Sequence, residues 1–192
     1  QRIFSNRYAF AALKENNSVI TWGSTPSGGD SSMVSSQLST GVREVFSNEN
    51  CFAALKENGS VVTWGRSESG GDSSSVNDRL SAGVTRVFAT ANAFAALREN
   101  GSVVVWGAEE EGGNETLHDV SSQLGYGIID IVSTGAAFSS LRKNGSVGSW
   151  GSISYGGDNS SVANELLDGV VKIFANRTAF AALKEDGSVI TW

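Results

Sequence analysis

Five tryptophans recur at almost constant spacing, and this feature constrains the fold more than any other. Successive tryptophans lie 42, 42, 44 and 42 residues apart, and a similar 22-residue unit ends at each of them. The units are 1–22, 43–64, 85–106, 129–150 and 171–192. All nine phenylalanines fall in two columns of this unit. Such a period predicts a tandem repeat whose units bury their apolar faces against one another, so 1–192 is interpreted as a single repeat array.

Four glycine-rich linkers join the units, at 23–42, 65–84, 107–128 and 151–170. Each linker begins with glycine directly after the tryptophan and carries a Gly-Gly pair, as in Gly28-Gly29. The third linker is two residues longer than the others and holds the only histidine, His118. In the first linker, residues 34–38 place Val and Leu four residues apart, which fits either one helical turn or a fourth outer strand.

Each unit contains three short segments rich in Val, Ile, Phe, Thr and Trp, which predict β-strands. Asn58-Gly59 lies between the last two segments of the second unit, and the sequence Asn-Gly is typical of a type I′ hairpin with positive φ at both residues. The first unit has Asn16-Asn17 there, which is compatible because Asn tolerates positive φ. The middle segment, Ala-Phe-Ala-Ala-Leu, is apolar on both faces, which indicates burial between two sheets. We therefore expect one three-stranded antiparallel sheet per unit, stable only when stacked on its neighbours.

The fold class that fits this pattern is all-β, a β-propeller-like array of five blades with three or four antiparallel strands each. A β-solenoid or an open superhelical array is the alternative. Five blades can close into a ring, but no strand is shared between the first and last units to latch it. Ends that coincide with unit boundaries fit equally well with a stretch of a longer array. Head-to-tail contacts that do not close would produce a filament.

Residues 54–65 read Ala-Leu-Lys-Glu-Asn-Gly-Ser-Val-Val-Thr-Trp-Gly and follow Gly41-Val42 and Val45-Phe46. This motif resembles the repeat of the regulator-of-chromosome-condensation superfamily, and it is most similar to the short-repeat branch that includes a secreted bacterial β-lactamase-inhibitor propeller. The resemblance covers all five units and implies blade-like sheets. Propellers of this family usually have seven blades, and they often carry Gly-Gln where this chain has Gly-Gly-Asp. No nucleotide-exchange or inhibitor contact residue of the family matches a position here.

Composition argues against several classes of function. The net charge of −6 and the pI near 4.8 argue against a nucleic-acid partner, which requires clustered Lys and Arg. The apolar runs are far too short for membrane insertion. One cysteine, Cys51, excludes an intrachain disulfide, and one histidine leaves little basis for catalysis or zinc binding. We therefore expect a protein that is not an enzyme and needs no cofactor.

The Gly-Gly-Asp motif offers the only candidate for a metal. Asp30, Asp72 and Asp158 follow three of the Gly-Gly pairs, and a carboxylate in each linker could contribute to a calcium site. A single carboxylate followed by Ser-Ser is a small ligand set. The favoured interpretation is a turn in which the aspartate side chain accepts a hydrogen bond from the backbone N–H two residues on.

Other polar residues also have two interpretations. Asn-x-Ser/Thr sequences at Asn58, Asn100, Asn144 and Asn176 are candidate glycosylation sites if the protein is secreted by a eukaryote, but the first three also occupy the hairpin column. His118, near Glu115 and Asp119, has no nucleophile beside it in the sequence, which favours a solvated loop residue. The run 109–111, three glutamates, favours a solvated acidic tip over a hydrolytic carboxylate pair. Cys51 and the tryptophans favour core positions.

Comparison between units separates the scaffold from positions that vary. The variable positions are the loop after the first strand and the loop after Trp-Gly, and loops on a rigid scaffold usually carry recognition. The candidate contact residues there are Arg7, Tyr8, Arg66, Glu68, Tyr155 and Arg177.

Two functions follow. The favoured one is an extracellular or cell-surface structural or adhesive repeat protein, acting by self-association or contact with neighbouring repeats and forming part of a longer or polymeric filament. The alternative is a discrete propeller that binds a protein or glycan through its variable loops.

Overall fold

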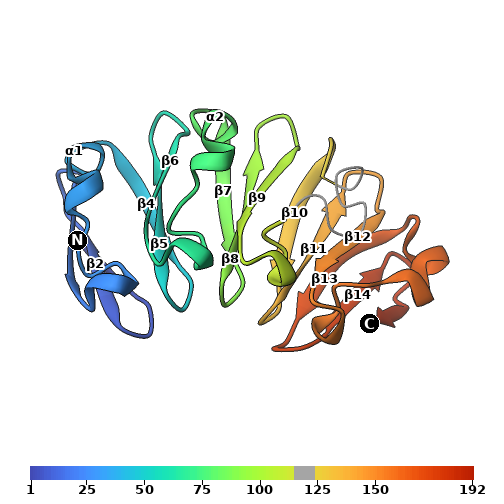
Figure 1. The fold of residues 1–192 in the computed structure, drawn as a ribbon. Helices are drawn as coiled ribbons and strands as arrows, with labels where there is room; N and C mark the ends of the chain where they lie inside the picture. Colours follow the sequence, from blue (N-terminus) through green and yellow to red (C-terminus); the bar gives the residue numbers. More distant parts are fainter. Residues whose placement is uncertain (115–123) are drawn as a thin grey trace.

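The computed structural model of the chain describes residues 1–114 and 124–192. It contains five three-stranded antiparallel sheets, each formed by one repeat unit with its strands in sequence order. The sheets, called blades here, stand side by side in chain order (Figure 1). His118, Glu115 and Asp119 lie outside the described residues.

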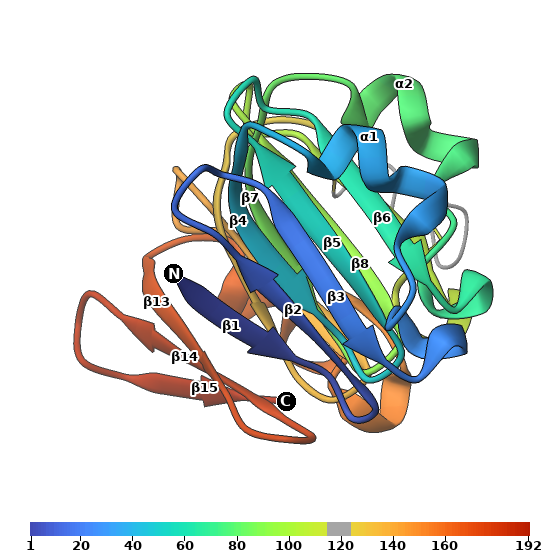
Figure 2. The same cartoon turned by 90° about the vertical axis from the view of Figure 1, so that its left-hand side faces the viewer.

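The strands of successive blades have closely similar lengths and bounds. They are β1 (Arg2–Ser5), β2 (Ala9–Leu13) and β3 (Val19–Gly23); β4 (Val42–Ser47), β5 (Cys51–Lys56) and β6 (Val61–Gly65); β7 (Val84–Ala89), β8 (Ala93–Arg98) and β9 (Val103–Gly107); β10 (Ile128–Ser133), β11 (Ala137–Arg142) and β12 (Val147–Gly151); and β13 (Val170–Ala175), β14 (Phe180–Lys184) and β15 (Val189–Thr191). Figure 2 views the row from its N-terminal end, with the strands of successive blades lying behind one another.

Each blade carries a stacked Phe–Trp pair across its second and third strands. In the second blade Phe52 lies directly opposite Trp64, and the two ring centroids are 5.3 Å apart. The equivalent pairs in the other four blades are separated by 5.3–5.5 Å. The second Phe column and the Trp column of the sequence therefore form one packing motif, repeated in every blade, that adds aromatic stacking to buried area.

The hairpin between the second and third strands differs from the predicted type I′ turn. Gly59 has φ of +76°, but Asn58 has negative φ, since Asn17 is the only non-glycine residue with positive φ among the described residues. The N–H of Gly59 donates to the Lys56 carbonyl, and the N–H of Lys56 donates to the Ser60 carbonyl. This is a three-residue loop in which the residue after the turn takes the left-handed conformation. Asn58 instead accepts hydrogen bonds from Ser60 through its side chain.

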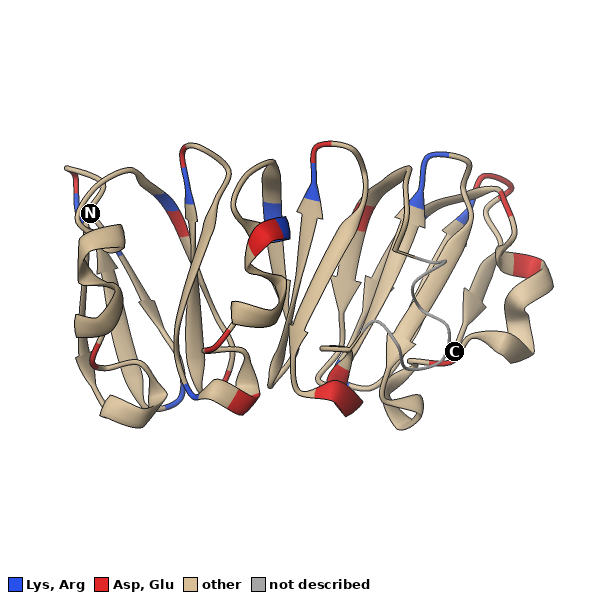
Figure 3. Ribbon diagram, turned by 45° about the horizontal axis from the view of Figure 1, so that its top comes forward, with Lys and Arg blue, Asp and Glu red and all other residues tan. Residues whose placement is uncertain are grey.

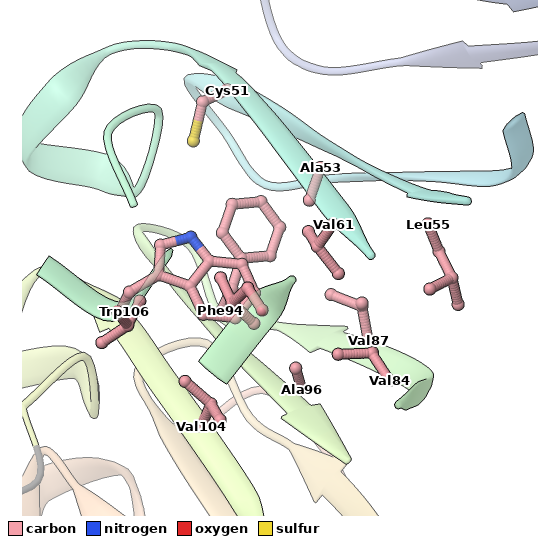
Figure 4. Close-up of a cluster of buried hydrophobic side chains, with 12 residues drawn as sticks. Cys51, Ala53, Leu55, Val61, Val84, Val87, Phe94, Ala96, Val104 and Trp106 are labelled. Carbon is pink, nitrogen blue, oxygen red and sulfur yellow. The ribbon is translucent and has the colours of Figure 1, made fainter. Parts of the chain in front are cut away.

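The core lies between the blades rather than within one of them. Figure 4 shows the junction of the second and third blades, where Cys51, Ala53 and Leu55 face Phe94 and Trp106 across the gap between the sheets. The small Ala and Cys side chains let the two sheets approach closely. All five residues of β5 from Cys51 to Leu55 are buried, so the prediction that the middle strand lies between sheets is confirmed.

The linkers form short helical turns. This excludes a fourth outer strand at residues 34–38 of the first linker, and the second linker has the same structure. The 3₁₀ turn Ser32–Val34 runs into α1 (Ser35–Leu38), and Ser74–Val76 runs into α2 (Asn77–Leu80). Leu38 and Leu80 are fully buried and fix these turns to the blades. Further 3₁₀ turns are Thr25–Ser27, Ser67–Ser69, Glu109–Glu111, Ile153–Tyr155 and Ser160–Leu166.

Each Gly-Gly turn covers the aromatic pair of the blade that follows it. The carbonyl of Gly28 accepts a 3.0 Å hydrogen bond from the Trp64 indole Nε1–H, and Gly70 accepts the same bond from Trp106. Gly28 has φ of +90°, and a Cβ atom there would lie 2.8 Å from the Phe52 ring. Glycine is therefore required both by the backbone conformation and by the close approach.

The described blades form an open row, with the first and fifth blades at opposite ends (Figure 1). The first strands of consecutive blades lie next to one another from β1 to β13. The outer faces of the two end blades have no neighbour: Phe10 and Trp22 are 43% and 42% exposed, whereas Phe52 and Trp64 are 0% and 4% exposed. Within the described ranges no helix has the length and apolar character that a membrane span requires.

Candidate functional site

The two sets of variable loops meet at the same end of the blades, opposite the hairpins. This follows from the strand directions, since the first strand ends where the third strand ends. Backbone bonds join the two loops in the first four blades, from the N–H of the residue after Trp-Gly to a carbonyl of the other loop: Ser24 to Tyr8, Arg66 to Asn50, Ala108 to Asn92 and Ser152 to Ala136. We call this surface the loop end.

The loop end is rigid because consecutive blades are also hydrogen-bonded there. The N–H of Glu49 donates to the Ala91 carbonyl at 3.0 Å, that of Ala91 to Gly135 at 2.9 Å, and that of Gly135 to Arg177 at 2.8 Å. These four residues occupy the same column of the repeat. A continuous chain of backbone bonds therefore crosses from the second blade to the fifth and links the backbones of the variable loops.

A cavity of about 410 Å³ opens on this surface above the fourth blade. Its floor includes Gly135 and Ala136, where the first two blades carry Arg7-Tyr8 and Glu49-Asn50. The third unit also has a small residue in this column, Ala91, and it too lines the cavity. The walls come from four other loops and are formed by Glu49, Glu110, Glu111, Tyr155 and Arg177.

The charges of the cavity are unequally distributed. Glu49 and Glu110 are exposed on the side of the second and third blades, whereas Arg177 stands on the side of the fifth blade. Glu111 is held in place because its carboxylate accepts two 2.9 Å hydrogen bonds from Asn92, one from the backbone N–H and one from the side-chain amide. Figure 3 shows acidic segments on the turns at the lower edge of the row, which is the loop end. The half-buried Tyr155 ring adds an aromatic surface between the two signs of charge.

The structure brings together only some of the residues predicted to contact a ligand. Tyr155 and Arg177 line the same cavity. Arg7 and Tyr8 lie together at the N-terminal blade, where the Arg7 guanidinium is 5.5 Å from the Tyr8 ring centroid. Glu68 lines a separate depression together with Glu109, and Arg66 is exposed directly before the Ser67–Ser69 turn that carries Glu68. The sequence interpretation missed Glu49, Glu110 and Glu111 as cavity residues. The available signal was the pair of small residues Ala91 and Gly135 in a column that holds Arg or Glu in the other units.

The Gly-Gly-Asp motif forms the predicted turn. One carboxylate oxygen of Asp30, Asp72 and Asp158 accepts a 2.9 Å hydrogen bond from the backbone N–H of the serine two residues on. This bond lowers the pKa of Asp30 and Asp72, and the Ser hydroxyl contributes to the same effect. Among the described residues no three His, Cys, Asp or Glu side chains cluster in a way that could hold a metal ion. Calcium binding at these aspartates stays a prediction, which a melting curve with and without chelator tests.

The remaining candidates occupy exposed turns or the core. Asn58, Asn100 and Asn144 are exposed at the hairpin end. The side-chain oxygen of each accepts a hydrogen bond from the backbone N–H of the serine two residues on. Asn176 is exposed at the loop end. Their glycosylation stays a prediction. Cys51 is fully buried, as predicted, and this burial raises the pKa of its thiol to about 12. Its low reactivity stays a prediction.

Comparison with known proteins identifies the architecture. No known protein-family model matches the chain, and no curated protein matches its sequence. Solved structures do match over nearly all of it. Prp20p from Saccharomyces cerevisiae has 18% sequence identity and a TM-score of 0.60, over 98% of this chain and 56% of that one. Yeast RCC1 (Prp20) bound to Kap60 has 19% identity and a TM-score of 0.58, over 98% of this chain and 55% of that one.

The chain has the fold of an RCC1-type repeat propeller. The resemblance inferred from residues 54–65 is thereby confirmed for the RCC1-type repeat, while the closer likeness to the β-lactamase-inhibitor branch stays a prediction. The ectodomain of the receptor kinase CR4 from Physcomitrella patens also matches, with 17% identity and a TM-score of 0.61, over 99% of this chain and 52% of that one. The chain thus spans little more than half the length of these structures, and at such identities the likeness establishes the fold.

Proposed function

We propose that this RCC1-type array is a non-enzymatic protein-binding module whose ligand contacts the loop end. The observation that carries the proposal is the cavity over Gly135-Ala136, because variable loops of four blades converge there on a shared hollow. Its walls combine carboxylates, an arginine and a tyrosine on a rigid base. Such a combination is typical of protein recognition, in which aromatic and Arg residues supply the main anchors.

The chemistry of the cavity favours a segment with a basic side chain. Glu110 and Glu49 are exposed carboxylates of the cavity, the latter also 3.8 Å from Arg7, and Tyr155 lines the same cavity. A Lys or Arg entering between them gains both carboxylate and cation–π contacts. Arg177, on the opposite wall, suits a neighbouring acidic side chain or a carbonyl of the same segment. The acidic net charge of −6 adds long-range attraction for a basic partner.

Structural neighbours support a protein as the ligand. The Prp20p structure is described together with the binding of that protein to Gsp1p and histones, and yeast RCC1 has been solved with Kap60 bound. These partners belong to those proteins. For this chain they support the general use of the fold as a platform for protein contacts.

Affinity capture from an extract with the wild-type chain, followed by titration of the captured protein against variants, tests this proposal. Glu110→Lys is expected to weaken binding at least tenfold, because it places a cation where the ligand has one. Glu99→Lys is the matched control, with the same charge change on an exposed hairpin at the opposite end. Equal affinity for both variants contradicts the proposal, and reproducible turnover by the purified protein contradicts its non-enzymatic part.

A structural or adhesive role is the second candidate. The exposed apolar faces of the two end blades favour it, because a face built like the internal junctions can stack on a further blade. In this proposal the protein is an extracellular or cell-surface repeat protein that forms part of a longer or filamentous array.

A further inference from the structure

Charged residues follow two columns of the repeat along the row of blades. The second position of the unit is occupied by Arg2, Glu44, Arg86, Asp130 and Lys172, so its charge alternates in sign from blade to blade. Neighbours in this column form ion pairs across two junctions: Arg2 with Glu44 at 3.5 Å and Arg86 with Asp130 at 2.7 Å. The column therefore matches opposite charges at the rim of the apolar interface.

The seventh position of the unit repeats this arrangement at the first junction. Arg7 of the first blade lies 3.8 Å from Glu49 of the second. The first blade thus presents two cations to the second blade, and two carboxylates of the second blade pair with them. No other unit of the chain carries carboxylates at both positions.

The fifth blade carries the charge pattern of the first blade. Lys172 takes the place of Arg2, and Arg177 takes the place of Arg7. The Lys172 ammonium lies 4.9 Å from the Phe174 ring centroid, just as the Arg2 guanidinium lies 5.3 Å from that of Phe4. Among the carboxylates of the described residues, none forms an ion pair with Lys172 or Arg177.

The apolar part of the same face is also uncovered. Val189 is 58% exposed, whereas Val19, its counterpart in the first blade, is buried against the second blade. Phe174 is 47% exposed. This surface, formed by Phe174, Val189, Lys172 and Arg177, is called the outer face of the fifth blade.

We propose that the outer face of the fifth blade docks a blade of the same repeat type that carries carboxylates at its second and seventh positions, as the second blade does. This proposal rests on the structural candidate above. The internal junction of the first and second blades supplies the template: matching apolar columns in the centre and two opposite-charge pairs at the rim. Continuity with this junction and charge complementarity identify the occupant.

An identical copy of this chain is a poor occupant. Its first blade would present Arg2 and Arg7 to Lys172 and Arg177. Two like-charge contacts would then replace the two ion pairs of the internal junction, and such contacts select against a partner whose apolar surface fits. The charge columns therefore favour a different, acidic blade over simple head-to-tail polymerisation.

Reversing the two cations tests the rule directly. Lys172→Glu combined with Arg177→Glu gives the fifth blade the carboxylates that Arg2 and Arg7 of another copy can pair with. We expect the wild-type chain to sediment as a monomer over a wide concentration range at low salt. The double variant is expected to form head-to-tail assemblies at protein concentrations at least tenfold lower than those the wild-type chain requires. In 0.5 M salt this difference is expected to disappear, because salt screens the exposed ion pairs.

A matched control separates this effect from net charge. Lys14→Glu with Lys143→Glu changes the charge by the same amount on exposed residues near the hairpins. This control is expected to stay monomeric. Adding Trp22→Ser to the reversed variant is expected to abolish assembly, because Trp22 lies on the exposed face of the first blade and its loss removes the apolar contact.

Three results would overturn the proposal: a folded reversed variant that stays monomeric, a wild-type chain that assembles as readily, or an assembly that survives Trp22→Ser. Circular dichroism establishes folding, and Lys172→Glu alone provides a milder variant with the same expected direction. Loop-end binding is measured separately with Glu110→Lys, so failure of this docking rule leaves the protein-binding proposal untouched.

Discussion

The Gly-Gly turn that covers each aromatic pair gives a quantitative test of how the blades hold together. Gly70 has φ of +97°, and a Cβ atom there would lie 2.9 Å from Phe94 and 3.2 Å from Trp106. Gly127 also has positive φ, +79°, but a Cβ atom there would have no atom within 4 Å. Gly70→Ala therefore adds backbone strain and overpacking, whereas Gly127→Ala adds backbone strain alone.

The two variants should differ by the packing cost only. An L-residue in the left-handed region costs about 1–2 kcal/mol, which applies to both. Carbon atoms pack best at about 3.5–4.0 Å, so a contact at 2.9 Å forces the Phe94–Trp106 pair or the linker to shift by more than half an ångström. Overpacking of this kind costs about 1–3 kcal/mol.

Thermal unfolding followed by circular dichroism measures the difference. For a chain of this size each kcal/mol corresponds to about 2–4 °C, so Gly70→Ala should melt about 2–12 °C below Gly127→Ala. The Trp106 indole should also lose its hydrogen bond to Gly70 and change its fluorescence. Equal melting temperatures for the two variants would refute the idea that the turn is fitted to the aromatic pair.

Three further predictions follow from burial and hydrogen bonding. Trp106→Ala should cost about 3–5 kcal/mol in urea unfolding because Trp106 is buried, and Trp22→Ala should cost less than half as much because Trp22 faces solvent; similar losses would contradict the open row. Cys51 should react with a thiol reagent at pH 8 about 100-fold more slowly in the native than in the unfolded protein, since burial raises the pKa of its thiol to about 12; rapid native labelling would contradict this. Hydrogen bonds from the Ser188 hydroxyl and N–H lower the pKa of Asp186 below its ordinary value of 3.8, so its stabilising effect is present above that pH and lost as the pH falls through the folded-state pKa. Asp186→Asn, which installs the residue of the other hairpins, should therefore lose less melting temperature than wild type between pH 5 and pH 3; an equal or larger loss in the variant would contradict the assignment.

The periodic parts of the fold could be predicted from the sequence because the same residues recur in the same places. The Trp spacing, the apolar middle segment and the Asn-Gly pair of the hairpin together predict stacked three-stranded sheets, and the structure has five of them. The type of hairpin could not be assigned from Asn58-Gly59 alone, because a three-residue loop and a two-residue loop use the same pair. Which residue takes positive φ depends on where the flanking strands stop pairing.

The loop-end cavity was harder to predict because it results from missing side chains. Sequence comparison draws attention to residues such as Arg7 and Tyr155, whereas the hollow is lined by the small residues Ala91, Gly135 and Ala136. Glu49 and Glu110 line it although they lie about 60 residues apart, since the three-dimensional stacking of blades brings their loops together. Only the repeat alignment, combined with the knowledge that both loops share one end of the blade, could have placed them side by side.

Ordering of the blades requires more than the apolar columns. Phe, Trp, Ala and Leu recur in every unit, so the central contact of one junction would also fit a blade from elsewhere in the row, and apolar packing alone does not distinguish the correct neighbour from a wrong one. The second and seventh positions supply that distinction, because Arg2 and Arg7 match Glu44 and Glu49 but would meet like charges on the fifth blade. Exposed ion pairs of this kind add little to stability, typically well under about 1 kcal/mol each. Their contribution is selectivity: the apolar columns make stacking favourable, and the charge columns determine which blade is accepted next.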